Sequence, residues 1–174
     1  MIDSRGIHQD ANFITSPNFD ERPDTPISLI VLHNISLPPG KYGSNDVIAL
    51  FTNCLDPNAH PYFAEIHSLK VSSHFFIRRD GSLLQFVPCL KRAWHAGQSN
   101  WRGRERCNDF SVGIELEGSD DEAFEDAQYI QLNQLLKVLL TQYPIEAITG
   151  HSDIAPGRKT DPGSYFDWSR IIKI

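Results

Sequence analysis

Residues 27–33, ISLIVLH, are the stretch that decides the fold. A nearly continuous run of branched apolar side chains is typical of a strand that is buried on both faces. The run ends at His33, and residues 34–46, NISLPPGKYGSND, are so rich in Pro, Gly, Ser and Asn that they predict an irregular loop. Strand ends that lead into loops commonly carry ligand-binding groups, so His33 is a candidate site residue.

A second strand is indicated by residues 110–118, FSVGIELEG. Because side chains alternate along a strand, Val112, Ile114 and Leu116 share one face. Glu115 and Glu117 share the other face with Gly113, and both carboxylates therefore point to the same side of the sheet.

The remaining elements follow from periodicity and turn signals. Residues 71–88 contain two apolar runs around Asp80-Gly81, which predicts a β-hairpin. Residues 121–144 place apolar side chains, Ile130 among them, at helical spacing before the stop signal Pro144. Shorter elements are expected as a helix over 47–53 capped by Asp46, a helical turn near 63–69, a strand over 145–149 and a closing helix over 166–174.

Hairpin strands combined with helices predict an α+β or α/β fold, in which a mixed central β-sheet is flanked by α-helices. The length of 174 residues fits one domain spanning 1–174, and the sequence contains no internal repeat. A hydrophobic content of 40% and a charged content of 22% are those of a globular protein with an ordinary core.

Charge and hydropathy exclude several classes of partner. The net charge of −6 argues against nucleic-acid binding, which favours a basic surface. The N-terminus has no apolar leader, and the longest apolar run is too short to span a bilayer, so we expect a cytoplasmic protein without a membrane partner. Separately, we expect a monomer. The three cysteines lack C-x-x-C spacing, which predicts reduced thiols rather than disulfides or a thiolate zinc site.

Residues 150–163, GHSDIAPGRKTDPG, concentrate polar chemistry in a segment without apolar periodicity. His151 follows a predicted strand, and Asp161 lies in a stretch stiffened by Pro156 and Pro162. Two imidazoles and a carboxylate suit zinc, which binds such ligands at about 2.0–2.2 Å and can leave a fourth tetrahedral position open. The three residues are scattered in sequence, so their spacing alone leaves open whether they bind metal or only hydrogen-bond.

Six strings carry a resemblance that bears on this question and that extends from about Ser16 to Trp168. They are LHNISLPPG, HPYFAEI, RRDGSLLQFVP, RAWHAG, GRERCNDFSVGIELEG and GHSDIAPGRKTDPG. Together they resemble the zinc-dependent N-acetylmuramoyl-L-alanine amidases of type 2, a family that includes phage lysozyme-type amidases and peptidoglycan recognition proteins. The resemblance implies a mixed sheet with packed helices. It further implies hydrolysis of the lactyl amide bond between 1,6-anhydro-N-acetylmuramic acid and L-alanine of muropeptides, in cytoplasmic cell-wall recycling.

The resemblance also implies roles for individual residues. One zinc ion per chain would be bound by His33, His151 and Asp161. Glu115 would be the catalytic carboxylate, with Lys159 as its partner at the reacting centre. The substrate would be held by Asn34, Trp94 and Arg106, the last facing a carboxylate of the peptide stem. Phage-type amidases carry a Tyr where this chain has Ser73, so a Tyr role is not transferred.

Two other functions compete with a zinc amidase. Peptidoglycan recognition proteins on a similar fold can lose zinc and only bind, which makes a non-catalytic binding protein for peptidoglycan fragments the main alternative. A cysteine hydrolase using Cys107 near His95 is the second. The sequence leaves open whether the 34–45 loop moves and how strictly an anhydro sugar is preferred.

Overall fold

The computed structural model describes residues 1–174. Its centre is a six-stranded sheet in the order β1-β5-β4-β9-β3-β10. The strands in that order are β1 Asn12–Phe13, β5 Leu83–Gln85, β4 Phe75–Ile77, β9 Ser111–Glu117, β3 Leu29–Ile35 and β10 Ala147–Gly150. The pair β4 and β5 is antiparallel and the other neighbours are parallel, so the predicted mixed sheet is confirmed.

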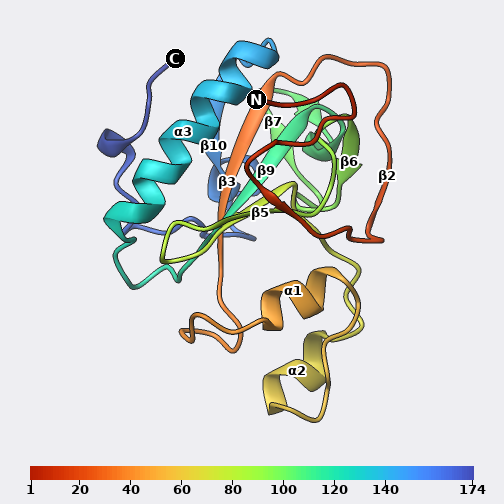
Figure 1. Ribbon diagram of the computed structural model, residues 1–174, viewed down its shortest axis with the longest axis vertical. Coiled ribbons are helices and arrows are strands. Elements are labelled where there is room, and N and C mark those ends of the chain that lie inside the picture. The colour runs from red at the N-terminus through yellow and green to blue at the C-terminus, as the bar shows by residue number, and fades with distance from the viewer.

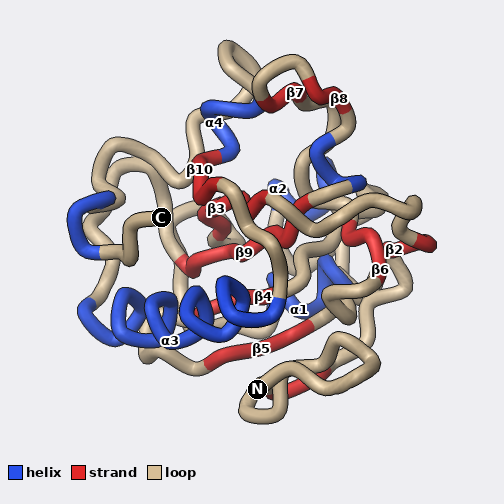
Figure 2. The backbone as a smooth tube through the Cα atoms, turned by 90° about the horizontal axis from the view of Figure 1, so that it is seen from above, coloured by secondary structure: helices blue, strands red, loops and turns tan.

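The two longest strands, β3 and β9, are largely buried on both faces, which the sequence predicts for β3. One face of β3 and β9 packs against α3, Asp126–Gln142, through a core that includes Ile30, Ile114 and Leu135. The other face packs against α4, His151–Ile154, and against the segment that holds β7, Asn100–Trp101, and β8, Arg104–Glu105. Figure 2 shows α3 on one side of the strands, with α4, β7 and β8 on the other.

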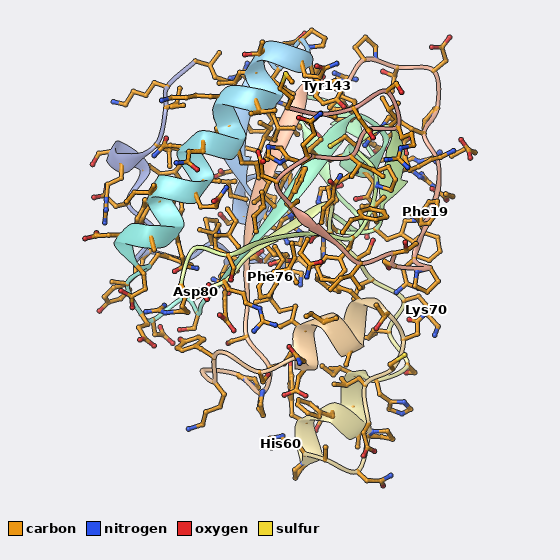
Figure 3. All side chains as sticks on the ribbon, viewed as in Figure 1. Phe19, His60, Lys70, Phe76, Asp80 and Tyr143 are labelled. Carbon is orange, nitrogen blue, oxygen red and sulfur yellow. The ribbon has the colours of Figure 1, made fainter.

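Two short helices lie beyond the carboxyl end of β3 (Figure 1). They are α1, Asp46–Phe51, and α2, Pro61–Ile66. They share a second core with the face of β4 and β5 opposite α3, and Phe76 and Phe51 are fully buried in it. Figure 3 places Phe76 between the strands and α1, with His60 at the start of α2. A separate two-stranded sheet pairs β2, Phe19–Glu21, with β6, Lys91–Ala93.

The structure corrects several local predictions. Asn45 is the N-cap of α1, and Asp46 is its first helical residue. The helical turn expected near 63–69 begins earlier, because the side chain of His60 accepts a hydrogen bond from the backbone of Tyr62 and Pro61 occupies the first turn. Ile130 is 61% exposed, because it lies on the outer side of α3.

The closing helix expected over 166–174 is wrong: only a 3-10 turn forms, at Trp168–Arg170. The side chain of Asn133 on α3 donates to the carbonyl of Arg170 and accepts from the amide of Ile172, so the tail satisfies its backbone against α3 instead of within a helix.

The segment 150–163 is not wholly irregular, because α4 supplies one helical turn. The carboxylate of Asp153 accepts from the amide of Gly150 and the hydroxyl of Thr149, which stabilises the start of that turn. No helix of the chain combines the length and apolar character needed to cross a membrane.

Candidate metal centre and active site

Three neighbouring strands place candidate site residues at the same end of the sheet. His33 on β3 is in register with Glu115 on β9, and residues in register on parallel strands point to the same face. On the other side of β3, Gly150 of β10 is paired with Leu32, so His151 emerges beside His33. The carboxyl edge of the sheet therefore gathers two imidazoles and a carboxylate.

Asp161 completes a cluster with the two histidines. The Nδ1 atoms of His33 and His151 are 2.9 Å apart, and each lies 3.0 Å from Oδ2 of Asp161. Both rings are buried, and the Asp161 side chain is 14% exposed. The amide of Ser152 donates to the carbonyl of Asp161, which ties the two ends of this segment together.

The protonation states of the cluster suit a cation. Burial lowers the pKa of His33 to about 4, although Asp161 acts in the opposite direction. Burial would raise the pKa of Asp161, but the adjacent imidazoles of His151 and His33 hold it below its usual range. Neutral imidazole and ionised carboxylate are the forms in which these side chains bind metals.

The contact of Nε2 of His151 shows which of its two nitrogens is available to a metal. Its Nε2 faces the carbonyl of Ala96 at 3.2 Å, and a carbonyl only accepts, so the neutral ring carries its proton there. Nδ1 of His151 then presents a lone pair towards His33 and Asp161. A tetrahedral zinc ion separates its ligand atoms by about 3.3–3.6 Å, close to the spacing here. The three residues therefore fit zinc.

Glu115 lies beside this cluster without a partner. Its side chain is buried, and Oε2 has no hydrogen-bond partner in the protein. Burial raises the pKa of Glu115 well above its usual value, the charge of Asp161 acts in the same direction, and Lys159 opposes both. An unsatisfied buried carboxylate oxygen is costly, so Glu115 is a candidate functional residue.

Glu117 differs from Glu115 although both lie on the same face of β9. Its Oε1 accepts from the amide of Gly43 at 2.6 Å, and its Oε2 accepts from the amide of Arg79 at 3.0 Å. Glu117 thus anchors the loop that follows β3.

A cleft of about 600 Å³ opens over the cluster. Glu115, Lys159, Asn34 and Trp94 line it together with the three cluster residues. The side chain of Asn34 donates to Oδ1 of Asp120 at 2.7 Å and to the carbonyl of Pro162 at 3.0 Å, so it also supports the loop that carries Asp161.

Arg106 is not brought to this cleft. It is exposed, lies 3.3 Å from a carboxylate oxygen of Asp109, and lines a neighbouring pocket of about 420 Å³. Arg158 lines both hollows and donates to the carbonyls of Ala96 and Gln98, so the two hollows adjoin at this side chain.

Other basic residues near Arg106 are occupied by carboxylates of the protein. Arg92 bonds Asp20 and Asp109, and Lys91 bonds Glu21. Among the cationic side chains that line the two hollows, Lys159 and Arg158 have no carboxylate partner, whereas Arg106 lies beside Asp109.

Sequence reasoning missed the apolar side of the cleft and one support of its rim. Leu50, Phe51 and Tyr62 from α1 and α2 line one wall, and only the fold places them there. Asp120 holds Asn34 and also accepts from the hydroxyl of Thr160. The signal available for Asp120 was its place just after a predicted strand end.

The structure disfavours the cysteine hydrolase. Cys107 is fully buried, its Sγ faces the carbonyl of Arg104, and burial raises its thiol pKa, which is the opposite of activation. Cys54 is exposed, Cys89 is buried, and all three thiols are free as predicted. Ser73 is buried and donates to the carbonyl of Phe75, away from the cleft.

Comparison with known proteins shows the family to which the chain belongs. Residues 23–164 match the family model described as N-acetylmuramoyl-L-alanine amidase. The chain is 57% identical to the 1,6-anhydro-N-acetylmuramyl-L-alanine amidase AmpD of Escherichia coli K12, over 98% of this chain and 95% of that relative. A crystal structure of an AmpD derivative, also 57% identical, superposes with a TM-score of 0.95 over 98% of this chain and 96% of that one.

A third similar structure is that of the amidase AmiD from E. coli in complex with the substrate anhydro-N-acetylmuramic acid-L-Ala-D-γ-Glu-L-Lys. It is 30% identical, with a TM-score of 0.62 over 97% of this chain and 60% of AmiD. The chain therefore belongs to the N-acetylmuramoyl-L-alanine amidase family.

Proposed function

We propose that this amidase is zinc-dependent and hydrolyses the lactyl amide bond between 1,6-anhydro-N-acetylmuramic acid and L-alanine. One observation carries the proposal. The candidate ligand atoms of His33, His151 and Asp161 all lie within 4.8 Å of one another, beside a buried Glu115 whose Oε2 has no hydrogen-bond partner. The substrate class is supported by the name of the AmpD relative and by the ligand of the AmiD complex. We extend the proposal to cell-wall recycling in the cytoplasm, which fractionation of cells would test.

The first requirement of the reaction is a nucleophile near neutral pH and a polarised carbonyl. Bound zinc supplies both, because it acts as a Lewis acid and lowers the pKa of a coordinated water towards about 7. His33, His151 and Asp161 would hold the ion, and the carboxylate of Asp161 would offset part of its charge.

The second requirement is proton transfer, because an amine is a poor leaving group. We assign it to Glu115, whose Oε2 is free to take a proton from the attacking water and deliver it to the departing nitrogen of L-alanine. Its raised pKa suits a group that must bind this proton and then release it.

Lys159 is the proposed stabiliser of the negative charge that develops on the carbonyl oxygen. It lines the cleft on a loop fixed by the backbone hydrogen bond from Lys159 to Ala155 and by the two bonds of Arg158. We propose that Asn34 and Trp94 contact the substrate in the cleft, and that Arg106 meets a stem carboxylate in the adjoining pocket.

Replacing Lys159 with Met should lower kcat about 10²-fold, because a preorganised charge near the oxyanion is lost. Steady-state hydrolysis of an anhydro-muropeptide measures this effect. Lys41→Met, at an exposed lysine that does not line the cleft, is the matched control and should retain kcat. An unchanged kcat in Lys159→Met would remove Lys159 from the reacting centre.

The proposed substrate is tested by digesting purified muropeptides with the zinc-loaded protein and analysing the products by mass spectrometry. We expect free stem peptide and anhydro-N-acetylmuramic acid, with no cleavage inside the peptide. Binding without any release of peptide would contradict the proposal and favour the non-catalytic binding protein. A parallel digestion of ordinary muramyl peptides measures the preference for the anhydro sugar.

A further inference from the structure

A series of hydrogen bonds links His33 to His95, which also lines the cleft, and then to Ser111 on β9. Nε2 of His33 lies 2.9 Å from Nδ1 of His95, and Nε2 of His95 lies 3.1 Å from Oγ of Ser111. The hydroxyl of Ser111 lies 2.6 Å from the carbonyl of Cys107. The proposed reaction does not use His95, yet its ring is buried and contacts a candidate metal ligand.

The carbonyl of Cys107, at the end of this series of hydrogen bonds, determines which atom donates in each of them. The carbonyl of Cys107 can only accept, so the single proton of the Ser111 hydroxyl points to it. Oγ of Ser111 must then accept from Nε2 of His95. In a neutral imidazole only one nitrogen carries a proton, so Nδ1 of His95 is an acceptor and receives the proton on Nε2 of His33.

The direction of these hydrogen bonds determines which nitrogen of His33 can bind a metal. With its proton on Nε2, the neutral ring of His33 presents the Nδ1 lone pair to His151 and Asp161. This is the tautomer that a metal bound at Nδ1 requires.

The ring of His95 is closely packed against β9 and two other imidazoles. A Cβ atom at Gly113 would lie 2.4 Å from Cγ of His95, so β9 makes room for the ring by having no side chain at this position. The ring also makes edge contacts with His33 and His74, at centroid distances of 5.0 and 5.7 Å. Its backbone amide donates to the side chain of Asn108.

We propose that His95 is a positioning residue for the metal ligand His33. The bond from His95 to Ser111 fixes the tautomer of His95, and His95 in turn fixes the tautomer and the ring orientation of His33. The inference rests on the proposed zinc centre. His95 accepts the Nε2 proton of His33, and the metal-binding nitrogen is thereby held unprotonated and aimed at the cluster.

Two variants of His95 separate this role from simple packing. His95→Phe keeps a ring but has no acceptor for His33. His95→Asn places a side-chain oxygen near the position of Nδ1 and keeps the acceptor. We expect His95→Phe to bind zinc about 10–100-fold more weakly in competition with a chelator, and His95→Asn to recover most of that loss. His67→Phe, at an exposed histidine outside the cleft, should bind zinc like the parent protein.

A second readout does not depend on metal or activity. In the metal-free protein, two-bond ¹H–¹⁵N correlation spectra report which nitrogen of His33 is protonated. We expect the Nε2–H tautomer in the parent protein and in His95→Asn, and a mixture of tautomers in His95→Phe.

Ser111→Ala provides an independent variant should His95→Phe fail to fold. Because it removes the acceptor of His95, together with the donor to the carbonyl of Cys107, we expect a mixed His95 tautomer and several-fold weaker zinc binding. A parent protein that binds no zinc would overturn the proposed function. Zinc affinity and a His33 tautomer that stay unchanged in His95→Phe, or in Ser111→Ala where His95→Phe does not fold, would overturn the positioning role while leaving the proposed function intact.

Discussion

Replacing Glu115 with Gln is expected to lower kcat for release of the stem peptide by about 10²–10⁴-fold, while the protein still binds one equivalent of zinc. The side chain keeps its size, but the amide can no longer take a proton from water and deliver it to the leaving nitrogen. His33, His151 and Asp161 are unchanged, so the loss should fall on kcat and not on metal content.

The same substitution should stabilise the metal-free protein. Oε2 of Glu115 is buried without a partner, and its pKa is raised on folding. The folded state then holds the proton more strongly than the unfolded state does, so the ionised form costs stability as the pH rises above the ordinary pKa of a glutamate. Removing a charge that lacks a partner should therefore raise the free energy of unfolding at pH 7, by about 1–3 kcal/mol.

Glu117→Gln is the matched control, since it changes a buried carboxylate on the same face of β9. Glu117 accepts from the amides of Gly43 and Arg79, so its variant should lose stability and retain most of kcat. Chemical denaturation and steady-state kinetics measure both quantities. A Glu115→Gln protein with parental kcat would eliminate the proposed base.

Removal of the metal is the second large effect. Dialysis against a chelator is expected to lower hydrolysis at least about 10³-fold, and one equivalent of zinc should restore it, because the chain itself offers no other Lewis acid to polarise the carbonyl. His151→Ala should lose activity to the same extent and should not recover at the zinc concentration that restores the parent protein. Full turnover by protein shown to be metal-free would contradict zinc dependence.

The elements with strong periodicity were predictable from sequence. The apolar run of β3, the hairpin of β4 and β5 and the spacing of α3 agree with the structure, whereas all seven residues of β9 are buried, including those on the face that its alternation marked as polar. The tail was not predictable, because its conformation depends on the side chain of Asn133, far away in sequence. Local propensity is overridden where a distant partner satisfies the backbone.

The site was predictable in part. His33, His151 and Asp161 were identified through a resemblance, and strand register explains how the two histidines come together. Arg106 was assigned to the same substrate-binding set, but its backbone turns with φ of 60° into the neighbouring pocket. A single residue with a positive φ produces no periodicity in the sequence, so the direction of Arg106 could not be predicted. The link from His33 through His95 to Ser111 was also invisible, because these residues meet only across folded strands.

X-ray absorption at the zinc edge, combined with a crystal structure of the zinc-loaded protein, tests the central claim most directly. We expect one zinc ion per chain, bound by Nδ1 of His33, Nδ1 of His151 and a carboxylate oxygen of Asp161, at about 2.0–2.2 Å. A protein that binds no zinc, or that binds it with other residues, would contradict the account.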